Sequence, residues 1–418
     1  MDKKAIKFAI KNGFLHIFSA NFINKIIQFG TTIILVRILS KSEYGSYTYA
    51  INILSMFLLI KGMGVTPGIL QYCSETEDRE KKLRFFKYGT KIGVLANGII
   101  ALAIFIYTQF FVLPIEGSTE ILRMLFLCPL ISIIFECFNV FYRADYKNKE
   151  FSILSVTNGF VLFLGTITLG MYFGVNGVVF ARYFAFIISV LVAVYFFKEY
   201  LNEYKSVQEP PRQSKNKFLK YSITCAFTNA ISQMLFLIDT FLVGLVLKDE
   251  TVVAAYKSAT LVPFNMLFIP TSVIVFVYPY FAKNYNNKKW IREKLFALEK
   301  YLLIFNILIS SILIIFAKPF ILILFGENYL DSIVPFRILM FGYIIAGSFR
   351  APAGNILASI KKVKVNFYNA IITGIANVIL DIALIYRYGS NGAAIATVLV
   401  FFITSVISNG YLYRYLND

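Results

Sequence analysis

The sequence predicts an all-α, polytopic membrane protein with twelve transmembrane helices in two pseudo-symmetric six-helix bundles. Three observations lead to this fold class. Hydrophobic residues make up 58% of the 418 residues and charged residues only 15%, whereas soluble domains average about 45–50% and about 25%. Apolar runs of membrane-spanning length recur along the chain. Lys and Arg gather in alternate loops. A soluble protein is excluded because no soluble fold of this size buries so much apolar surface.

Each predicted span is a run of roughly 20 mostly apolar residues, the length that crosses the hydrocarbon core as a helix. The runs are 14–36, 44–66, 88–112, 119–142, 151–173, 176–197, 218–247, 252–281, 299–323, 332–357, 365–386 and 390–413. The first run is too long for a cleavable signal peptide, contains Lys25, and lacks a small-residue cleavage site.

Basic residues are distributed unequally between the two sides of the predicted membrane. With the N-terminus inside, 29 of the 41 Lys and Arg residues lie in inner segments and 5 in outer loops. Cytoplasmic loops carry such an excess, so we expect both termini to be cytoplasmic. Most of the net charge of +18 then reflects orientation and contact with anionic membrane lipids. No basic domain remains outside the spans, which argues against nucleic-acid binding.

The longest polar interruption, at 198–217, divides the chain into two halves. We predict an N-terminal bundle over 1–198, a cytoplasmic linker over 199–217 and a C-terminal bundle over 218–418. The segment FGVNGVVFA at 173–181 resembles YGSNGAAIA at 388–396, at an offset of 215 residues. Asn and Gly tolerate positive φ, so each segment predicts a tight outer turn. Two halves with the same orientation predict a cleft between two bundles.

The second helix of each half contains residues that interrupt helices. These are Gly62, Gly64, Pro67 and Gly68 in the first half, and Pro263, Pro270 and Pro279 in the second. Interrupted helices at matching positions point to a transport site. A packing kink is the alternative.

Charged residues inside the predicted spans are costly and therefore indicate function. The acidic ones, Glu136, Asp239 and Asp381, are candidates for ion coupling, and the sequence leaves open whether the driving force is a proton, Na⁺ or the membrane potential alone. The candidate substrate-binding residues are Lys25, Gln28, Asn24, Arg123, Arg182, Lys257, Arg337 and Arg350. The excess of basic groups, which also include Lys61, predicts a cavity that attracts phosphate or pyrophosphate.

Structural alternatives exist for several of these residues. Lys25 lies on a polar stripe of the first helix with Asn24 and Gln28, and such a stripe also forms hydrogen-bonded helix contacts. Asp239 and Lys257 fall at similar depth and could pair with each other. Some basic side chains near span ends could reach the membrane interface. They are Lys61, Arg123, Arg182, Arg337 and Arg350.

The motifs of catalysis are missing from the sequence. It has no phosphate-binding loop of the Gly-x-x-x-x-Gly-Lys-Ser/Thr type and a single histidine, His16. The four cysteines match neither a zinc site nor a disulfide framework. We therefore predict no enzyme activity, no metal and no cofactor. The short outer loops also argue against a membrane glycosyltransferase or polymerase.

Three motifs in order resemble the bacterial polysaccharide-repeat-unit flippases of the O-antigen or Wzx type. They are RILSKSEYG at 37–45, LFGENY at 324–329, and NVILD at 377–381 followed by YGSNGAA at 388–394. This family belongs to the MATE-like multidrug/oligosaccharidyl-lipid/polysaccharide exporter superfamily. The peptidoglycan-precursor flippases are close relatives but usually have fourteen spans.

The resemblance implies a MATE-like fold that works by alternating access in the bacterial inner membrane. It implies a flippase that moves undecaprenyl-pyrophosphate-linked oligosaccharide from the inner to the outer leaflet, for O-antigen in lipopolysaccharide biosynthesis or for capsule. A polysaccharide polymerase and a chain-length regulator are the partners it implies. The alternative that the sequence leaves open is a MATE-like exporter of small molecules.

Overall fold

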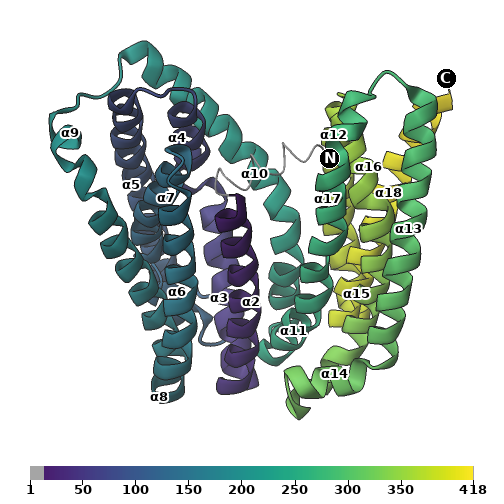
Figure 1. Ribbon diagram of the computed structural model, residues 1–418. Coiled ribbons are helices and arrows are strands. Elements are labelled where there is room, and N and C mark those ends of the chain that lie inside the picture. Colours follow the sequence, from purple (N-terminus) through teal and green to yellow (C-terminus); the bar gives the residue numbers. More distant parts are fainter. Residues whose placement is uncertain (1–13, 418) are drawn as a thin grey trace. The chain divides into compact units, whose positions relative to one another are not determined.

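The structure is a computed structural model that describes residues 14–417, and its regular elements are helices throughout this range (Figure 1). The chain forms two compact units, Met1–Met234 and Leu235–Asp418, and each is described by itself below. The boundary falls inside one helix, α10 (Arg212–Leu247). The bundle limits predicted from the sequence, which place the division in a linker, stay a prediction.

The first unit is a bundle of helices. Its elements before α10 are α2 (Phe14–Ile38), α3 (Lys41–Phe57), η1 (Leu58–Gly64), α4 (Val65–Ser74), α5 (Arg79–Phe110), α6 (Ser118–Met124), α7 (Cys128–Ala144), α8 (Asn148–Phe196), η2 (Phe197–Tyr200) and α9 (Leu201–Ser206). Ser40 and Glu43 form a capping box that begins α3, and Asp78 caps α5. Phe86, Phe141 and many other aromatic side chains fill the core of this unit.

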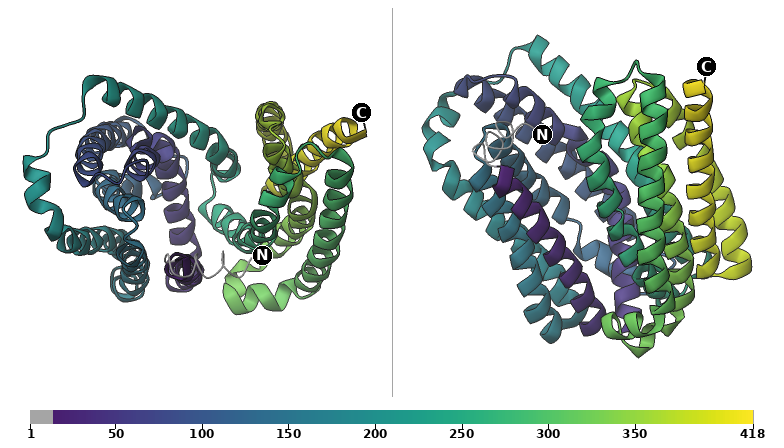
Figure 2. Two further views of the ribbon diagram at one scale, coloured as in Figure 1. Left: turned by 45° about the horizontal axis from the view of Figure 1, so that its top comes forward. Right: turned by 45° about the vertical axis from the view of Figure 1, so that its right-hand side comes forward.

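The second unit continues the helical pattern after α10. Its elements are α11 (Glu250–Met266), α12 (Phe268–Lys283), α13 (Lys288–Ile315), α14 (Ala317–Leu324), η3 (Glu327–Ser332), α15 (Ile333–Ile345), η4 (Ala346–Arg350), α16 (Ala351–Ser359), α17 (Val363–Tyr388) and α18 (Ser390–Asn417). Helices α17 and α18 pack side by side (Figure 2). The element η4 is a π-helix between α15 and α16, a local irregularity that often marks functional positions.

The described helices are consistent with a multi-pass membrane protein. Eight of them are long and apolar enough to cross a membrane, or nine if the bent pair α6–α7 forms one span. One of the eight, Asn148–Ser206, contains a non-helical residue at Gly174, between two of the spans that the sequence predicts. The predicted number of twelve spans stays a prediction. Helix α5 begins nine residues before its predicted span, so the basic residues there lie on a helix and not in a loop.

The two sequence segments that predicted matching turns have the same backbone conformation. Gly174 has φ 56° and ψ −137°, and Gly389 has φ 59° and ψ −139°, a region that only glycine adopts readily. Three residues later, a Cβ atom on Gly177 would lie 1.9 Å from the carbonyl oxygen of Leu169, and one on Gly392 would lie 2.0 Å from that of Leu384. Both glycines therefore permit the same close backbone approach, which confirms the predicted internal similarity at these turns.

The predicted interruption of the second helix is present in the first unit. Gly62, Met63 and Gly64 all have positive φ, and Lys61 is extended. The amide N–H of Gly62, which the break leaves without a helical partner, donates a hydrogen bond of 2.7 Å to Oδ1 of the buried Asn97.

The corresponding segment of the second unit differs from the prediction. Pro263 lies inside α11, and the residue that joins α11 to α12, Leu267, keeps a helical backbone with φ −57° and ψ −17°. The reason is that the φ of proline fits a helix, whereas runs of glycine allow the left-handed region. The two interruptions therefore do not match in geometry.

The predicted linker is folded onto the first unit and contains η2 and α9. The Lys87 Nζ atom donates to the carbonyl oxygens of Tyr204 and Val207, at 3.1 and 2.8 Å. Glu209 lies between two lysines, with its carboxylate 2.7 Å from Lys91 Nζ and 2.5 Å from Lys215 Nζ. Hydrogen bonds from Lys215 and Lys91 lower the pKa of Glu209 to about 2.

Candidate functional site

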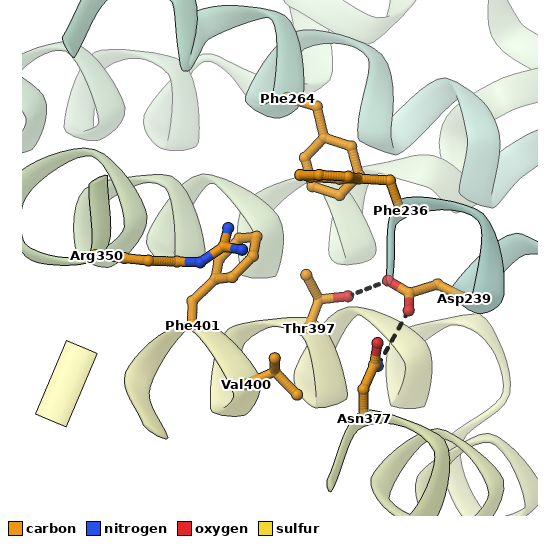
Figure 3. Close-up of a pocket in the computed structure, with 8 residues that line it drawn as sticks. All are labelled: Phe236, Asp239, Phe264, Arg350, Asn377, Thr397, Val400 and Phe401. Carbon is orange, nitrogen blue, oxygen red and sulfur yellow. Dashed lines mark hydrogen bonds between the residues drawn. The ribbon is translucent and has the colours of Figure 1, made fainter. Parts of the chain in front are cut away.

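The second unit contains a buried cluster of polar side chains centred on Asp239 of α10 (Figure 3). The hydroxyl of Thr397, on α18, donates to Oδ2 of Asp239 at 2.6 Å, and the Nδ2 atom of Asn377, on α17, donates to Oδ1 at 3.1 Å. The hydroxyl of Tyr256, on α11, donates to Oδ2 at 3.3 Å. Four helices thus converge on one carboxyl group.

A second carboxyl group, Asp381, belongs to the same cluster. The Nδ2 atom of Asn377 donates to it at 2.8 Å, so one amide group bridges both acids. Asp381 is completely buried, and its Oδ1 atom has no hydrogen-bond donor among the described residues. Two neighbouring buried carboxyl groups are not both ionised unless a bound cation compensates their charge; otherwise at least one of them keeps its proton.

The donor atoms of this cluster suit a small hard cation. Asp239 and Asp381 supply carboxylate oxygens, Asn377 an amide oxygen and Thr397 a hydroxyl, and the main-chain carbonyl of Ala393 lies 3.0 Å from that hydroxyl. Oxygen ligands are preferred by hard cations. The Oδ1 atom of Asp381, which has no hydrogen-bond donor among the described residues, is a further oxygen that suits a hard cation. The adjoining pocket has space for about one water-sized ligand.

Aromatic side chains and one arginine complete the lining of this pocket. The aromatic residues are Phe236, Phe264 and Phe401, and Val400 is also part of the wall. The half-buried Arg350, the last residue of the π-helix η4, places its guanidinium group 4.8 Å from the ring centre of Phe401 (Figure 3). Within the described part of the chain no acidic residue pairs with Arg350.

The structure brings Asp239 and Asp381 together, but it does not pair Asp239 with Lys257. Lys257 is half-buried on α11 and close enough to Asp239 for an electrostatic interaction. Among the described residues, however, it forms no ion pair, and the hydrogen bonds to Asp239 come from neutral side chains. The carboxyl cluster therefore has no bonded counter-charge.

The third predicted coupling residue, Glu136, lies in the first unit and has a basic partner. Lys61 Nζ donates to its Oε1 atom, and both side chains are about one-quarter to one-third exposed. Lys61 precedes the Gly62–Gly64 break, so the ion pair joins the interrupted helix to α7. The charge of Glu136 is compensated within its own unit, unlike that of the Asp239 cluster.

Two predicted binding residues, Arg123 and Arg337, contact the ends of helices. Arg123 Nη2 donates to the carbonyl of Thr108 at 2.6 Å, near the end of α5, and Arg337 Nε donates to the carbonyl of Ile314 at 3.1 Å, near the end of α13. Cations are favourable beside the C-terminal carbonyls of helices. This common contact supports the structural alternative for both arginines.

The remaining predicted residues lie in the first unit. Arg182 Nη2 donates to the hydroxyl of Tyr47 at 2.9 Å, whereas its Nε atom is buried without a partner among the described residues. On α2, Lys25 and Gln28 are exposed within this unit, and Asn24 is half-buried against α8 beside Gly159. The structure thus orients Lys25 and Gln28 away from the packed core of their own bundle.

Sequence reasoning did not identify Asn377, Thr397 and Tyr256 as site residues. Asn377 precedes Asp381 by one helical turn, and this i, i+4 spacing on a membrane helix is a signal that could have been used. Thr397 and Tyr256 have no such signal, because they lie on other helices and only the tertiary fold brings them to Asp239.

Long apolar helices with charged groups buried among them are typical of a multi-pass membrane protein. The sequence matches the family described as "Polysaccharide biosynthesis protein" over residues 10–285, and the MatE family over residues 224–383. Since the first match covers more than half of the chain, the chain belongs to the polysaccharide biosynthesis protein family.

Similar proteins and structures agree with this membership. The capsular polysaccharide biosynthesis protein CapF of Staphylococcus aureus is 24% identical, over 97% of this chain and 99% of CapF. The lipid II flippase MurJ, in an inward closed conformation, has a TM-score of 0.75 at 17% identity, over 95% of this chain and 87% of MurJ. An inward-facing MATE family multidrug transporter of the MOP superfamily has a TM-score of 0.73 at 14% identity, over 94% of both chains. The fold is therefore MATE-like and MurJ-like.

Proposed function

We propose that the protein is a flippase for undecaprenyl-pyrophosphate-linked oligosaccharide repeat units, which it moves from the inner to the outer leaflet by alternating access. The observation that carries the proposal is membership of the polysaccharide biosynthesis family in a chain whose fold resembles that of a lipid II flippase. A capsule precursor is favoured over an O-antigen precursor by the similarity to CapF. We place twelve spans, in two bundles of six, in the bacterial inner membrane with both termini in the cytoplasm.

Basic groups in both units support an anionic substrate. Lys25 is exposed within its unit, Arg182 keeps a buried Nε atom without a partner, and Arg350 has no acidic partner among the described residues. Guanidinium groups bind phosphate oxygens in a bidentate manner, and ammonium groups bind them as point charges. We propose that these three residues, with Lys257, contact the pyrophosphate group, and that Asn24 and Gln28 add hydrogen bonds.

We further propose that the carboxyl cluster around Asp239 and Asp381 couples transport to a small cation, either a proton or Na⁺. The support is a pair of buried carboxyl groups that share one amide donor and lack a bonded basic partner in the described chain. Glu136 is less suited to this role, because Lys61 already compensates its charge.

The function is tested by complementing a deletion strain of the native host. We expect the wild-type gene to restore surface glycan. The deletion strain should accumulate lipid-linked repeat units on the cytoplasmic side of the membrane. Asp239→Asn should lower glycan export at least tenfold at normal protein abundance, whereas Glu327→Gln, a change at an exposed acid outside the pocket, should not. Normal glycan in the deletion strain would contradict the flippase proposal. Crosslinking to a polysaccharide polymerase or chain-length regulator would test the proposed partners.

A MATE-like exporter of small molecules is the second candidate. The match of residues 224–383 to the MatE family and the similarity to a multidrug transporter favour it. Exporters of organic cations need acidic cavities, whereas Lys25 is exposed within its unit and Arg350 has no acidic partner among the described residues. Increased drug sensitivity of the deletion strain, with normal surface glycan, would support this candidate over the flippase.

A further inference from the structure

A turn of the first unit recurs in the second unit, 215 residues later in the sequence. Tyr146, between α7 and α8, and Lys361, between α16 and α17, both have positive φ, at 58° and 63°. The amide N–H of the following residue donates to the carbonyl oxygen five positions earlier, at 2.9 Å for Lys147 and 2.8 Å for Lys362. Lys147 and Lys362 therefore hold the same place in the two units.

In the first unit, this lysine shares a tyrosine ring with an arginine. Lys147 and Arg79, the first residue of α5, place their charged groups 5.9 and 4.3 Å from the ring centre of Tyr200. Two carboxylates compensate these charges. That of Glu199 lies 2.7 Å from Lys147 Nζ, and that of Glu203 lies 3.0 Å from Arg79 Nε. The first unit thus supplies its own anions at this ring.

The second unit repeats the ring and the basic pair. Tyr415 follows Tyr200 by the same 215 residues. Lys362 and Lys288, the first residue of α13, place their ammonium groups 4.6 and 4.9 Å from the ring centre of Tyr415. We call these three residues the Tyr415 site. Both lysines are half-buried, so their positions are defined by packing.

The acid that binds the lysine is not repeated. The counterpart of Glu199 is Arg414, which has the opposite charge. Within residues 14–417, no carboxylate forms an ion pair with Arg414 or with the two lysines of the Tyr415 site. The counterpart of Glu203, Asp418, lies outside the described residues.

Further basic side chains around the Tyr415 site also lie against tyrosines. Lys361 Nζ is 4.6 Å from the ring centre of Tyr285, and the guanidinium group of Arg292 is 5.8 Å from that of Tyr413. An aromatic ring compensates less of a cation's charge than a carboxylate does. This end of the second unit therefore attracts an anion from outside the protein.

We propose that the Tyr415 site binds the phosphate group of an anionic phospholipid through Lys288 and Lys362, and that Arg414 adds to the attraction. The phosphate takes the place that the Glu199 carboxylate has in the first unit, since both groups accept charge-assisted hydrogen bonds. A lipid is favoured over a soluble anion because the site lies at the ends of α13, α17 and α18, three helices able to cross a membrane. Basic and aromatic side chains at such ends meet the lipid headgroups.

The single tryptophan of the sequence, Trp290, reports on this site, because it follows Lys288 by two residues and packs against Phe281. The full-length protein is reconstituted in phosphatidylcholine vesicles that contain a minor fraction of a lipid with a nitroxide quencher near the top of one acyl chain. Quenching of tryptophan fluorescence by labelled phosphatidylglycerol, relative to labelled phosphatidylcholine, measures the preference for the anionic lipid. We expect a preference of roughly 25-fold, from about fivefold for each lysine.

Matched variants test the role of each charge. Lys288→Gln and Lys362→Gln should each lower the preference about fivefold. Arg414→Glu should abolish it, because the variant restores the carboxylate that the first unit has. Lys147→Gln removes the same charge from the first unit and should leave the preference unchanged.

Four results overturn the proposal. The first is equal quenching by the two lipids in the wild type, and the second is an equal loss in Lys147→Gln and Lys362→Gln. The third is an unchanged preference in Arg414→Glu, a change at an exposed side chain that keeps the test decisive if the lysine variants do not reconstitute. The fourth is relief of quenching by inorganic pyrophosphate or by an acidic peptide at constant ionic strength, which assigns the site to a soluble anion or to a protein partner.

Discussion

Lys61 and Glu136 form an ion pair between the interrupted second helix of the first unit and α7. The two residues are 75 positions apart in sequence. Lys61 directly precedes three residues with positive φ, so this contact and the hydrogen bond from Gly62 to Asn97 hold a strained segment in place. The pair therefore explains how the break is stabilised inside the bundle.

The ion pair between Lys61 and Glu136 predicts that removing one of its two charges destabilises the protein more than removing both. Lys61→Met or Glu136→Leu alone leaves a partly buried charge without its partner and should destabilise the protein by about 1–3 kcal/mol. The double variant should recover most of that loss, because no uncompensated charge remains. Thermal unfolding in detergent measures the effect. If Glu136 instead couples transport, the double variant will be stable yet unable to export glycan.

A second prediction concerns the repeated turns. Gly392→Ala places a Cβ atom 2.0 Å from the Leu384 carbonyl oxygen, and Gly177→Ala places one 1.9 Å from that of Leu169. The backbone must move in both cases, so we expect each variant to lose about 2 kcal/mol or more. Gly410→Ala, where no atom lies within 4 Å of the new Cβ, is the matched control. Unequal effects of the two repeated glycines would argue against a shared turn geometry.

The sequence predicted these turns because their signal is local. A Gly-x-Asn-Gly pattern sets backbone conformation within a few residues, and the same pattern recurs 215 residues later. The apolar runs likewise located the helices, since hydropathy needs no knowledge of tertiary contacts. The extension of α5 to Arg79 was missed because charged residues can continue a helix beyond the hydrocarbon region.

The candidate site was only half predictable, because its contacts join distant parts of the sequence and have no local signal. Asp239 and Asp381 were recognisable as acids within apolar spans, but nothing in the sequence places them together. Thr397 resembles any other polar residue of a membrane helix until folding brings it to Asp239. The partner of Glu136 was also missed, since the two helices that carry the pair are separated by α4 to α6.

A third prediction concerns Lys25, which is exposed within its own unit. Lys25→Ala should abolish surface glycan while leaving protein abundance normal, because a cation in the membrane that contacts the substrate contributes to binding and little to packing. Lys25→Arg keeps the charge and should retain part of the activity. Glycan staining and immunoblotting of a complemented deletion strain measure both quantities. Unchanged glycan in Lys25→Ala would remove this residue from the proposed binding site.

The fourth prediction concerns pH and the folded linker. Lys215 and Lys91 lower the pKa of Glu209 to about 2 in the folded protein, against about 4.3 in an unfolded chain. A carboxyl group with a lowered pKa stabilises the folded form above its unfolded pKa, and this contribution is lost as the pH falls toward the folded value. The linker should therefore detach from α5 progressively between about pH 4 and pH 2.

Pepsin, which is active in this range, provides the measurement. We expect the rate of cleavage within 199–211, relative to an unstructured reference peptide, to rise as the pH falls from 4 to 2.5. Glu209→Gln lacks the ionised carboxylate at every pH, so its linker should be cleaved rapidly at pH 4 and show little further change. Glu199→Gln is the matched control, because Glu199 lies on the same linker and its carboxylate pairs with Lys147 next to α8 rather than with a residue of α5. A rise of equal size in wild type and Glu209→Gln would show that another group controls the docking of this segment.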